Sequence, residues 1–238
     1  MIYKIKKKIA FAVSMIKDGK IKQVWQAMAR RIKSEEVAYG FKRDLEVRFA
    51  KPRALLKIST RVYQKDDGQF FTERKNDGLI NDFHTCYVGV TKDDIPCCHL
   101  WLIDASQNER LKRAWGNTFP TLKEDELLVE NVYTVPKYRG LGVFPTFLDD
   151  IVEKGMAMGA KSMISFGEAS NVNMSRSFVY TGFQPYTVRR KKWFLFCKSI
   201  SFEPLSEEEL KLFNQQTATY KAKTFGYLML NEAYSEVM

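Results

Sequence analysis

The stretch "VENVYTVPKYRGLGVFPTFLDDIVEKG", residues 129–155, joins an apolar run to an amphipathic segment through two closely spaced glycines, Gly140 and Gly142. The run "ELLVENVYTV" predicts a buried strand, and after the loop apolar residues recur at helical spacing: Phe144, Phe147, Leu148, Ile151 and Val152. Pro145 suits the first turn of such a helix, where a missing N–H costs little. A strand, a glycine-rich turn and a helix N-terminus together predict backbone N–H groups that can bind an anion.

Two common phosphate-binding motifs are excluded by the residues of this loop. No Gly-Lys-Ser/Thr follows it, so it is not a P-loop. The third glycine position of the dinucleotide fingerprint holds neither Gly nor Ala.

The rest of the chain predicts a mixed sheet flanked by helices on both faces, an α/β (α+β) fold. Strands are expected at "STRVYQ", "HTCYVGVT", "PCCHLWLID", "ELLVENVYTV", "KSMISFGE" and in a hairpin over "PYTVRRKKWFLFCKSISF". A short helix is expected to end at Gly182-Phe183, and a last one to begin at Ser206, capped by Glu209. Residues 34–58 are expected to be irregular.

Residues 127–183 resemble the acyl-CoA-binding core of the GNAT superfamily of N-acetyltransferases. That family has a strand ending in Val, a Pro-x-Tyr-Arg-Gly-x-Gly loop, an amphipathic helix, another strand, and an Asn-containing turn into a short helix that closes with Gly-Phe. All of these steps occur here in order. The resemblance implies the GNAT fold over about residues 59–202 and an acetyl-CoA or other acyl-CoA donor.

The same resemblance implies roles for individual residues. The pantetheine arm of CoA would bond to the strand edge at Tyr133 and Val135 and touch Asn171. A backbone N–H near Val132 or Tyr133 would polarise the thioester carbonyl. The CoA pyrophosphate would lie on the loop formed by Lys137, Arg139, Gly140, Gly142 and Val143.

The general base and general acid of such a reaction are less well defined. Glu130 on the strand is the expected base, with Glu168 as a second candidate; a solvent-facing role for Glu130 is the alternative. Many family members place a Tyr acid on the short helix, and Phe178 stands at that position here. Because a free thiol has a pKa of only about 8.5, a thiolate can leave without an enzymic acid.

The basic charge is concentrated at the N-terminus. Residues 1–33 carry ten Lys or Arg and one acidic residue, a net charge of +9, whereas the remaining residues total only +1. Apolar residues at helical spacing predict an amphipathic helical arm. Such an arm either packs on the main domain or lies on an anionic membrane surface, and nucleic acid is not the expected partner.

Cysteine and histidine usage does not predict a metal site. The four cysteines match no zinc template, and His84 and His99 are the only histidines. We expect reduced, buried thiols in a cytoplasmic, alternatively membrane-peripheral, protein. Strand alternation is expected to bury one of Cys97 and Cys98 and expose the other.

The sequence therefore predicts a helical N-terminal arm (residues 1–58), a GNAT acyltransferase domain (59–202) and a helical C-terminal extension (203–238). The expected activity is transfer of an acyl group from a CoA thioester to an amine of a small molecule, an amino sugar or a protein. The alternative is an acyl-CoA-binding module with weak or no turnover, with or without membrane association. A homodimer is also compatible with the sequence.

Overall fold

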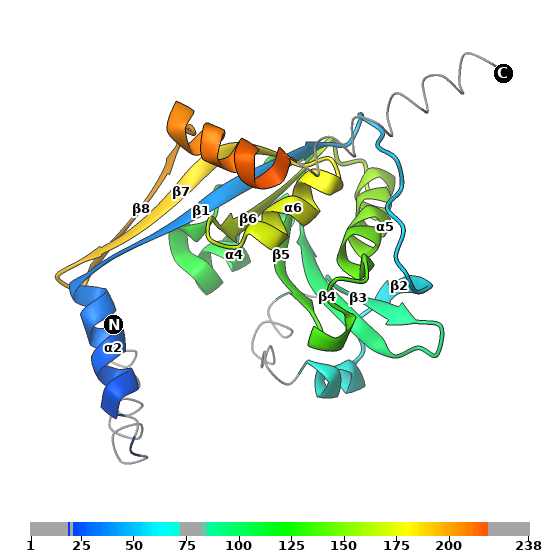
Figure 1. The fold of residues 1–238 in the computed structure, drawn as a ribbon, viewed down its shortest axis with the longest axis horizontal. Helices are drawn as coiled ribbons and strands as arrows, with labels where there is room; N and C mark the ends of the chain where they lie inside the picture. Colours follow the sequence, from blue (N-terminus) through cyan, green and yellow to red (C-terminus); the bar gives the residue numbers. More distant parts are fainter. Residues whose placement is uncertain (1–18, 20, 72–82, 84, 219–238) are drawn as a thin grey trace. The chain divides into compact units, whose positions relative to one another are not determined.

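A computed structural model describes residues 19, 21–71, 83 and 85–218 of the chain (Figure 1). Two compact units are found, one formed by Met1–Val37 with Arg189–Phe202 and the other by Ala38–Val188 with Glu203–Met238. These units do not coincide with the predicted division at residues 58 and 202, which stays a prediction about domains. None of the helices in the described ranges is long and apolar enough to cross a membrane.

Eight strands form one sheet in the order β2-β3-β4-β5-β6-β1-β7-β8. The first three antiparallel steps and the parallel pair β5–β6 make the sheet mixed, as predicted. All the strands expected from the sequence are present. Their bounds are β1 Lys33–Asp44, β2 Ile58–Val62, β3 Cys86–Thr91, β4 Pro96–Ile103, β5 Glu126–Thr134, β6 Ser162–Glu168, β7 Gln184–Phe194 and β8 Cys197–Glu203.

Strand β1 corrects the expectation that residues 34–58 are irregular. It lies between β6 and β7 in the sheet and runs antiparallel to β6, with Ala38 opposite Glu168 and Asp44 opposite Ser162. Gly40 fits there because it has no side chain: a Cβ would lie 2.4 Å from Thr187 Cγ2 and 2.8 Å from Phe166 Cε1. The sequence did not predict this strand because its glycine and charged residues interrupt the apolar pattern that is typical of a strand.

The buried Arg43 and the partly exposed Lys42 of β1 both have partners. Arg43 is buried, donates a hydrogen bond to the Thr181 carbonyl and lies 3.7 Å from Asp149 Oδ1. Burial lowers the pKa of Arg43 and raises the pKa of Asp149, because each charged form loses water, and the opposite charge offsets part of both shifts. Lys42 Nζ donates to Glu126 Oε1 at 3.0 Å. These partners let two cations sit in a strand of the sheet.

The α-helices and 3₁₀ turns lie between the strands and at the two ends of the described chain. The described α-helices with assigned bounds are α2 Ile21–Ile32, α4 Asn108–Trp115, α5 Val143–Ala157 and α6 Val172–Tyr180, and a further helix covers residues 207–218. The 3₁₀ turns are η1 Lys65–Phe70, η2 Ala105–Gln107, η3 Gly116–Thr118 and η4 Pro136–Tyr138. The predicted cap of the last helix is confirmed, since Glu209 N–H donates to Ser206 Oγ and Ser206 N–H to Glu209 Oε2.

Helices cover both faces of the sheet, which confirms the predicted fold class. On one face α5 packs against Leu127 and Met163, where a Cβ on Gly155 would lie 2.9 Å and 2.3 Å from their side chains. The neighbouring residues Leu128 and Ile164 point the other way and share a core with Leu111 of α4. Helix α5 and the strands it covers are drawn in Figure 1.

Burial of the cysteines differs from the expectation. Cys97 and Cys98 are both buried, because both faces of β4 are covered, and Cys197 is exposed. All four thiols are free, as predicted, and burial raises the pKa of Cys86 far above that of an ordinary thiol.

Phe41 tests the place of β1 in the sheet. Its side chain is fully buried and stacks on Phe178 with ring centroids 5.0 Å apart. Phe41→Ala is expected to lower the free energy of unfolding by about 3–5 kcal/mol, measured by urea denaturation. Phe194→Ala, at a side chain 64% exposed, is the control and should change it by about 0.5 kcal/mol or less. Equal effects would contradict a core role for β1.

Candidate functional site

A bulge interrupts β5 at the centre of the sheet. His99 lies opposite Tyr133 and Trp101 opposite Glu130, so β5 uses three steps where β4 uses two. Asn131, inside this segment, has a φ of 52°, in the left-handed region. The extra residue places the side chains of Glu130 and Tyr133 on the same face of the sheet, because each faces a residue of β4 that points to that face.

The pairing of β5 with β6 ends just before the bulge. Their parallel pairing runs from Glu126 opposite Ser162 to Val129 opposite Ser165. Both strands nevertheless continue, β5 to Thr134 and β6 to Glu168. The β5 residues after Val129 therefore pair with β4 on one side and are not paired with β6 on the other.

The glycine loop follows β5 directly and leads into α5. Gly140 and Gly142 have φ values of 78° and 72°, which explains two glycines in so short a turn. For the N–H groups of residues 140–144, the described part of the chain provides no acceptor. These groups lie before and within the first turn of the 15-residue helix α5, whose dipole adds positive charge. The loop can therefore bind an anion through its backbone.

Position 142 must be a glycine because a neighbouring segment of the backbone packs against it. A Cβ at this position would lie 2.8 Å from the carbonyl oxygen of Arg53 and 3.2 Å from Cα of Ala54. Leu55 N–H donates to the carbonyl of Leu141 at 2.9 Å, which fixes the segment against the loop. Gly140 is different, since a Cβ there would meet no atom within 4 Å. The connector before β2 thus supports the loop, a role that the sequence did not indicate.

Two basic side chains of the loop have different surroundings. Arg139 Nε donates to the carbonyl of Thr134 at 3.0 Å, and its guanidinium lies 5.6 Å from the centre of the Tyr133 ring. The backbone N–H of Arg139 donates to the carbonyl of Pro136 within the turn. The residue is exposed, so its guanidinium can contact a ligand. Lys137 Nζ lies 4.8 Å from the ring centre of Tyr138 and is exposed.

The backbone of Val135 is occupied within the protein. Its N–H donates to Cys97 and its carbonyl accepts from Tyr138, both at 2.9 Å. In an antiparallel ladder the preceding residue, Thr134, turns its backbone groups away from β4, and its carbonyl already accepts from Arg139 Nε. The N–H of Thr134 is thus better placed for a strand-edge contact than the N–H of Val135, and the assignments of Tyr133 and Val135 stay predictions.

The two candidate bases lie in different surroundings. Glu130 is half-buried on the face that α4 covers, opposite Trp101, whereas Glu168 is exposed at the end of β6. His99, which sequence reasoning did not select, is fully buried and its ring stacks on Tyr133 at 5.8 Å. Only the register of β4 against β5 could have placed this imidazole next to the bulge. His84 lies outside the described residues.

Asn171 and Phe178 have structural roles at the two ends of α6. Asn171 is the N-cap, and its Oδ1 accepts from Met174 N–H at 3.1 Å. Phe178 is fully buried and contacts the rings of Phe41, Phe144 and Phe183 at 5.0 to 5.7 Å. A tyrosine hydroxyl at position 178 would lie in this aromatic core, so no general acid is found there.

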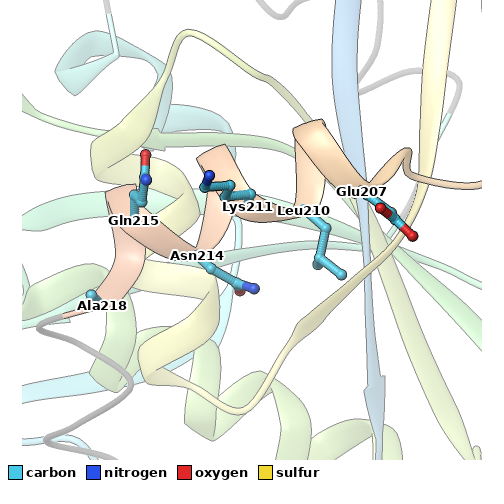
Figure 2. A pocket seen from close by; sticks show the side chains of 6 residues that line it. All are labelled: Glu207, Leu210, Lys211, Asn214, Gln215 and Ala218. Atoms are coloured by element: carbon cyan, nitrogen blue, oxygen red, sulfur yellow. The ribbon is translucent and has the colours of Figure 1, made fainter.

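A groove of about 480 Å³ lies along the helix at residues 207–218 (Figure 2). It is lined by Glu207, Leu210, Lys211, Asn214, Gln215 and Ala218, all from this one helix. No residue of the glycine loop or of β5 contributes to it. Within the described ranges, no three His, Cys, Asp or Glu residues are grouped as a metal site would need.

No protein-family model and no curated protein matches the chain. Solved structures with a similar fold include GCN5-related N-acetyltransferases. One is a glucosamine N-acetyltransferase region of a fungal multi-domain β-N-acetylglucosaminidase, with 12% identity and a TM-score of 0.49, over 71% of this chain and 23% of that one.

Two others are similar to the same extent. A GCN5-related N-acetyltransferase from Sphaerobacter thermophilus has 11% identity and a TM-score of 0.48 over 74% of this chain and 57% of that one. A GNAT-family acetyltransferase from Colwellia psychrerythraea has 9% identity and a TM-score of 0.47, with 76% and 61% covered. This chain thus spans less than two thirds of the length of each.

The bulge can be tested at Asn131. Because its φ is positive, Asn131→Val is expected to lower the free energy of unfolding by about 1–2 kcal/mol relative to Asn131→Gly. Urea denaturation of the two variants measures this difference. Equal stabilities would show that residue 131 does not keep a left-handed conformation in solution.

Proposed function

We propose that the chain is an acyl-CoA-dependent N-acyltransferase, with acetyl-CoA as the donor to be tested first. The observation that carries the proposal is the run of N–H groups at residues 140–144, placed directly after the bulged strand β5. A pyrophosphate needs several donors of this kind, and the exposed side chains of Arg139 and Lys137 add positive charge beside them. The motif resemblance over residues 127–183 points to the same donor.

The groups of the chain have distinct tasks in this reaction. A bound acyl-CoA supplies a thioester, and an N–H near Val132 or Tyr133 stabilises the charge that develops on its carbonyl oxygen. The acceptor amine attacks the carbonyl carbon, so a C–N bond forms and the C–S bond breaks. Glu130 accepts the proton that the amine loses. Because Phe178 has no hydroxyl, CoA leaves as the thiolate.

The core position of Phe178 favours one other function, an acyl-CoA-binding module without turnover. Release of free thiol from acetyl-CoA, measured with a panel of primary amines that includes amino sugars and a peptide, distinguishes the two. Thiol release above the protein-free rate supports the enzyme.

Donor binding is expected to raise the melting temperature of the protein in millimolar acetyl-CoA. Gly140→Asn should abolish this shift, because the new side chain projects from the loop beside the N–H groups. Asn tolerates a positive φ, so the cost in unfolding free energy should be about 1 kcal/mol or less. Gly142 is a poorer probe, since a side chain there would collide with Arg53 and disturb the fold.

Gly159→Asn is the matched control for that experiment. Gly159 has a φ of 82° and an open Cβ position, like Gly140, but it follows the other end of α5. The control variant should lose a similar amount of stability and keep the full shift. If acetyl-CoA does not change the melting curve of the unaltered protein, the donor assignment is wrong.

Glu130→Gln tests the base. With an amine that supports thiol release, kcat/KM is expected to fall about 10²- to 10³-fold, while the acetyl-CoA melting shift is retained. Glu168→Gln, at the exposed end of β6, is the control and should keep its rate within about twofold. The reverse result would assign the base to Glu168.

A further inference from the structure

Helix α2 exposes an apolar stripe in a strongly basic setting. Ile21, Trp25, Met28 and Ile32 are spaced four, three and four residues apart, and all are exposed, Trp25 to 66%. The helix contains no acidic residue. Its basic residues Lys22, Arg30 and Arg31 form no ion pair within the described part of the chain. Among the described residues of its unit, nothing buries these four apolar side chains.

A second apolar feature belongs to the same compact unit. The turn between β7 and β8 consists of Leu195 and Phe196, with φ values of 44° and 67°. Two-residue turns of this kind favour Asn-Gly, because bulky residues are strained at positive φ. Both side chains are nevertheless more than half exposed, as is Phe194 before them. A contact that buried these side chains would offset the cost of the strained turn and of the exposed apolar surface.

Backbone hydrogen bonds hold these two features together. Leu195 N–H donates to the carbonyl of Ile32 at 2.9 Å, and Phe196 N–H donates to that of Arg31 at 2.8 Å. The turn therefore caps the C-terminal end of α2. The combined surface is called the apolar tip below, and it consists of Trp25, Met28, Ile32, Phe194, Leu195 and Phe196.

The compact unit that carries the apolar tip has a much more positive net charge than the rest of the chain. Met1–Val37 with Arg189–Phe202 contains 15 Lys or Arg and three acidic residues, a net charge of +12. The remaining residues contain 23 Lys or Arg and 25 acidic residues, a net charge of −2. Glu35 and Glu36 in the first unit are engaged by Arg190, Lys191 and Lys192.

These features favour an anionic lipid surface over other occupants. Basic residues beside exposed Trp, Phe and Leu side chains suit the boundary between lipid headgroups and acyl chains. A nucleic acid would use the charge but would not cover the apolar tip. A second copy of this chain would bring another +12 to the same surface and be repelled. With 12 residues, α2 can lie in the interface but cannot span the bilayer.

We propose that the apolar tip, formed jointly by α2 and the β7–β8 turn, inserts into the interface of anionic membranes. This goes beyond the proposed acyltransferase activity and does not depend on it. It also assigns to residues 194–196 a role that the N-terminal arm alone does not predict.

Flotation of the full-length protein with lipid vesicles tests the proposal. Vesicles of phosphatidylcholine with about 30% phosphatidylglycerol should carry the protein, vesicles of phosphatidylcholine alone should carry much less, and salt of about 0.5 M should weaken the binding. The double variant Leu195→Asn/Phe196→Gly should bind at least about tenfold more weakly. Because Asn-Gly suits this turn, the variant should keep or raise the melting temperature, so lost binding cannot be ascribed to unfolding.

Met156→Asn/Leu212→Asn is the matched control, since it removes two exposed apolar side chains that lie in the other unit. This variant should float like the unaltered protein. Failure of the unaltered protein to float with anionic vesicles would overturn the proposal. So would equal flotation of the turn variant, or a dimer of the full-length protein, seen by light scattering, that the turn variant dissociates.

Discussion

The parting of β5 from β6 after Val129 and Ser165 is the constraint on which the candidate site depends. Up to that pair the strands share a ladder and carry cores on both faces. Beyond it the bulge at Asn131 turns β5, and the chain continues into the glycine loop and α5. Catalytic candidates, loop donors and aromatic residues gather where the ladder stops, because only there are backbone groups released from regular pairing.

The glycine loop is also supported by residues that precede β2 in the sequence. The backbone of Arg53 and Ala54 approaches Gly142, and Leu55 bonds to Leu141. The two glycines therefore serve different purposes although their φ values are alike. Gly142 admits a neighbouring segment of the protein, whereas Gly140 has open space beside it, where a ligand can approach.

Local patterns predicted the local parts of this structure. The strand–loop–helix unit and the Ser206–Glu209 cap follow from turn chemistry and periodicity within a few residues, which the sequence displays directly. The β7–β8 hairpin follows from its two apolar strands, although its turn residues Leu195 and Phe196 are not typical of a tight turn. Strand β1 could not be predicted in this way, because Gly40, Lys42 and Arg43 fit a sheet only through Thr187, Glu126 and Asp149, which lie far along the chain. The position of His99 beside Tyr133 and the approach of Arg53 to Gly142 could not be predicted for the same reason. Burial of both Cys97 and Cys98 likewise follows from helices on both faces, not from alternation in β4.

The central position of β1 has a consequence for synthesis of the protein. Ala38 pairs with Glu168, about 130 residues later in the chain, and β7 follows after that, so β1 leaves the ribosome well before its partner strands. Until then Tyr39 and Phe41 have no strand to pair beside and remain open to unwanted association. The sheet can close only after β6 and β7 have been made, and non-local contacts of this kind slow folding. An interior strand whose partners lie so far along the chain thus makes closure of the sheet nearly all-or-none.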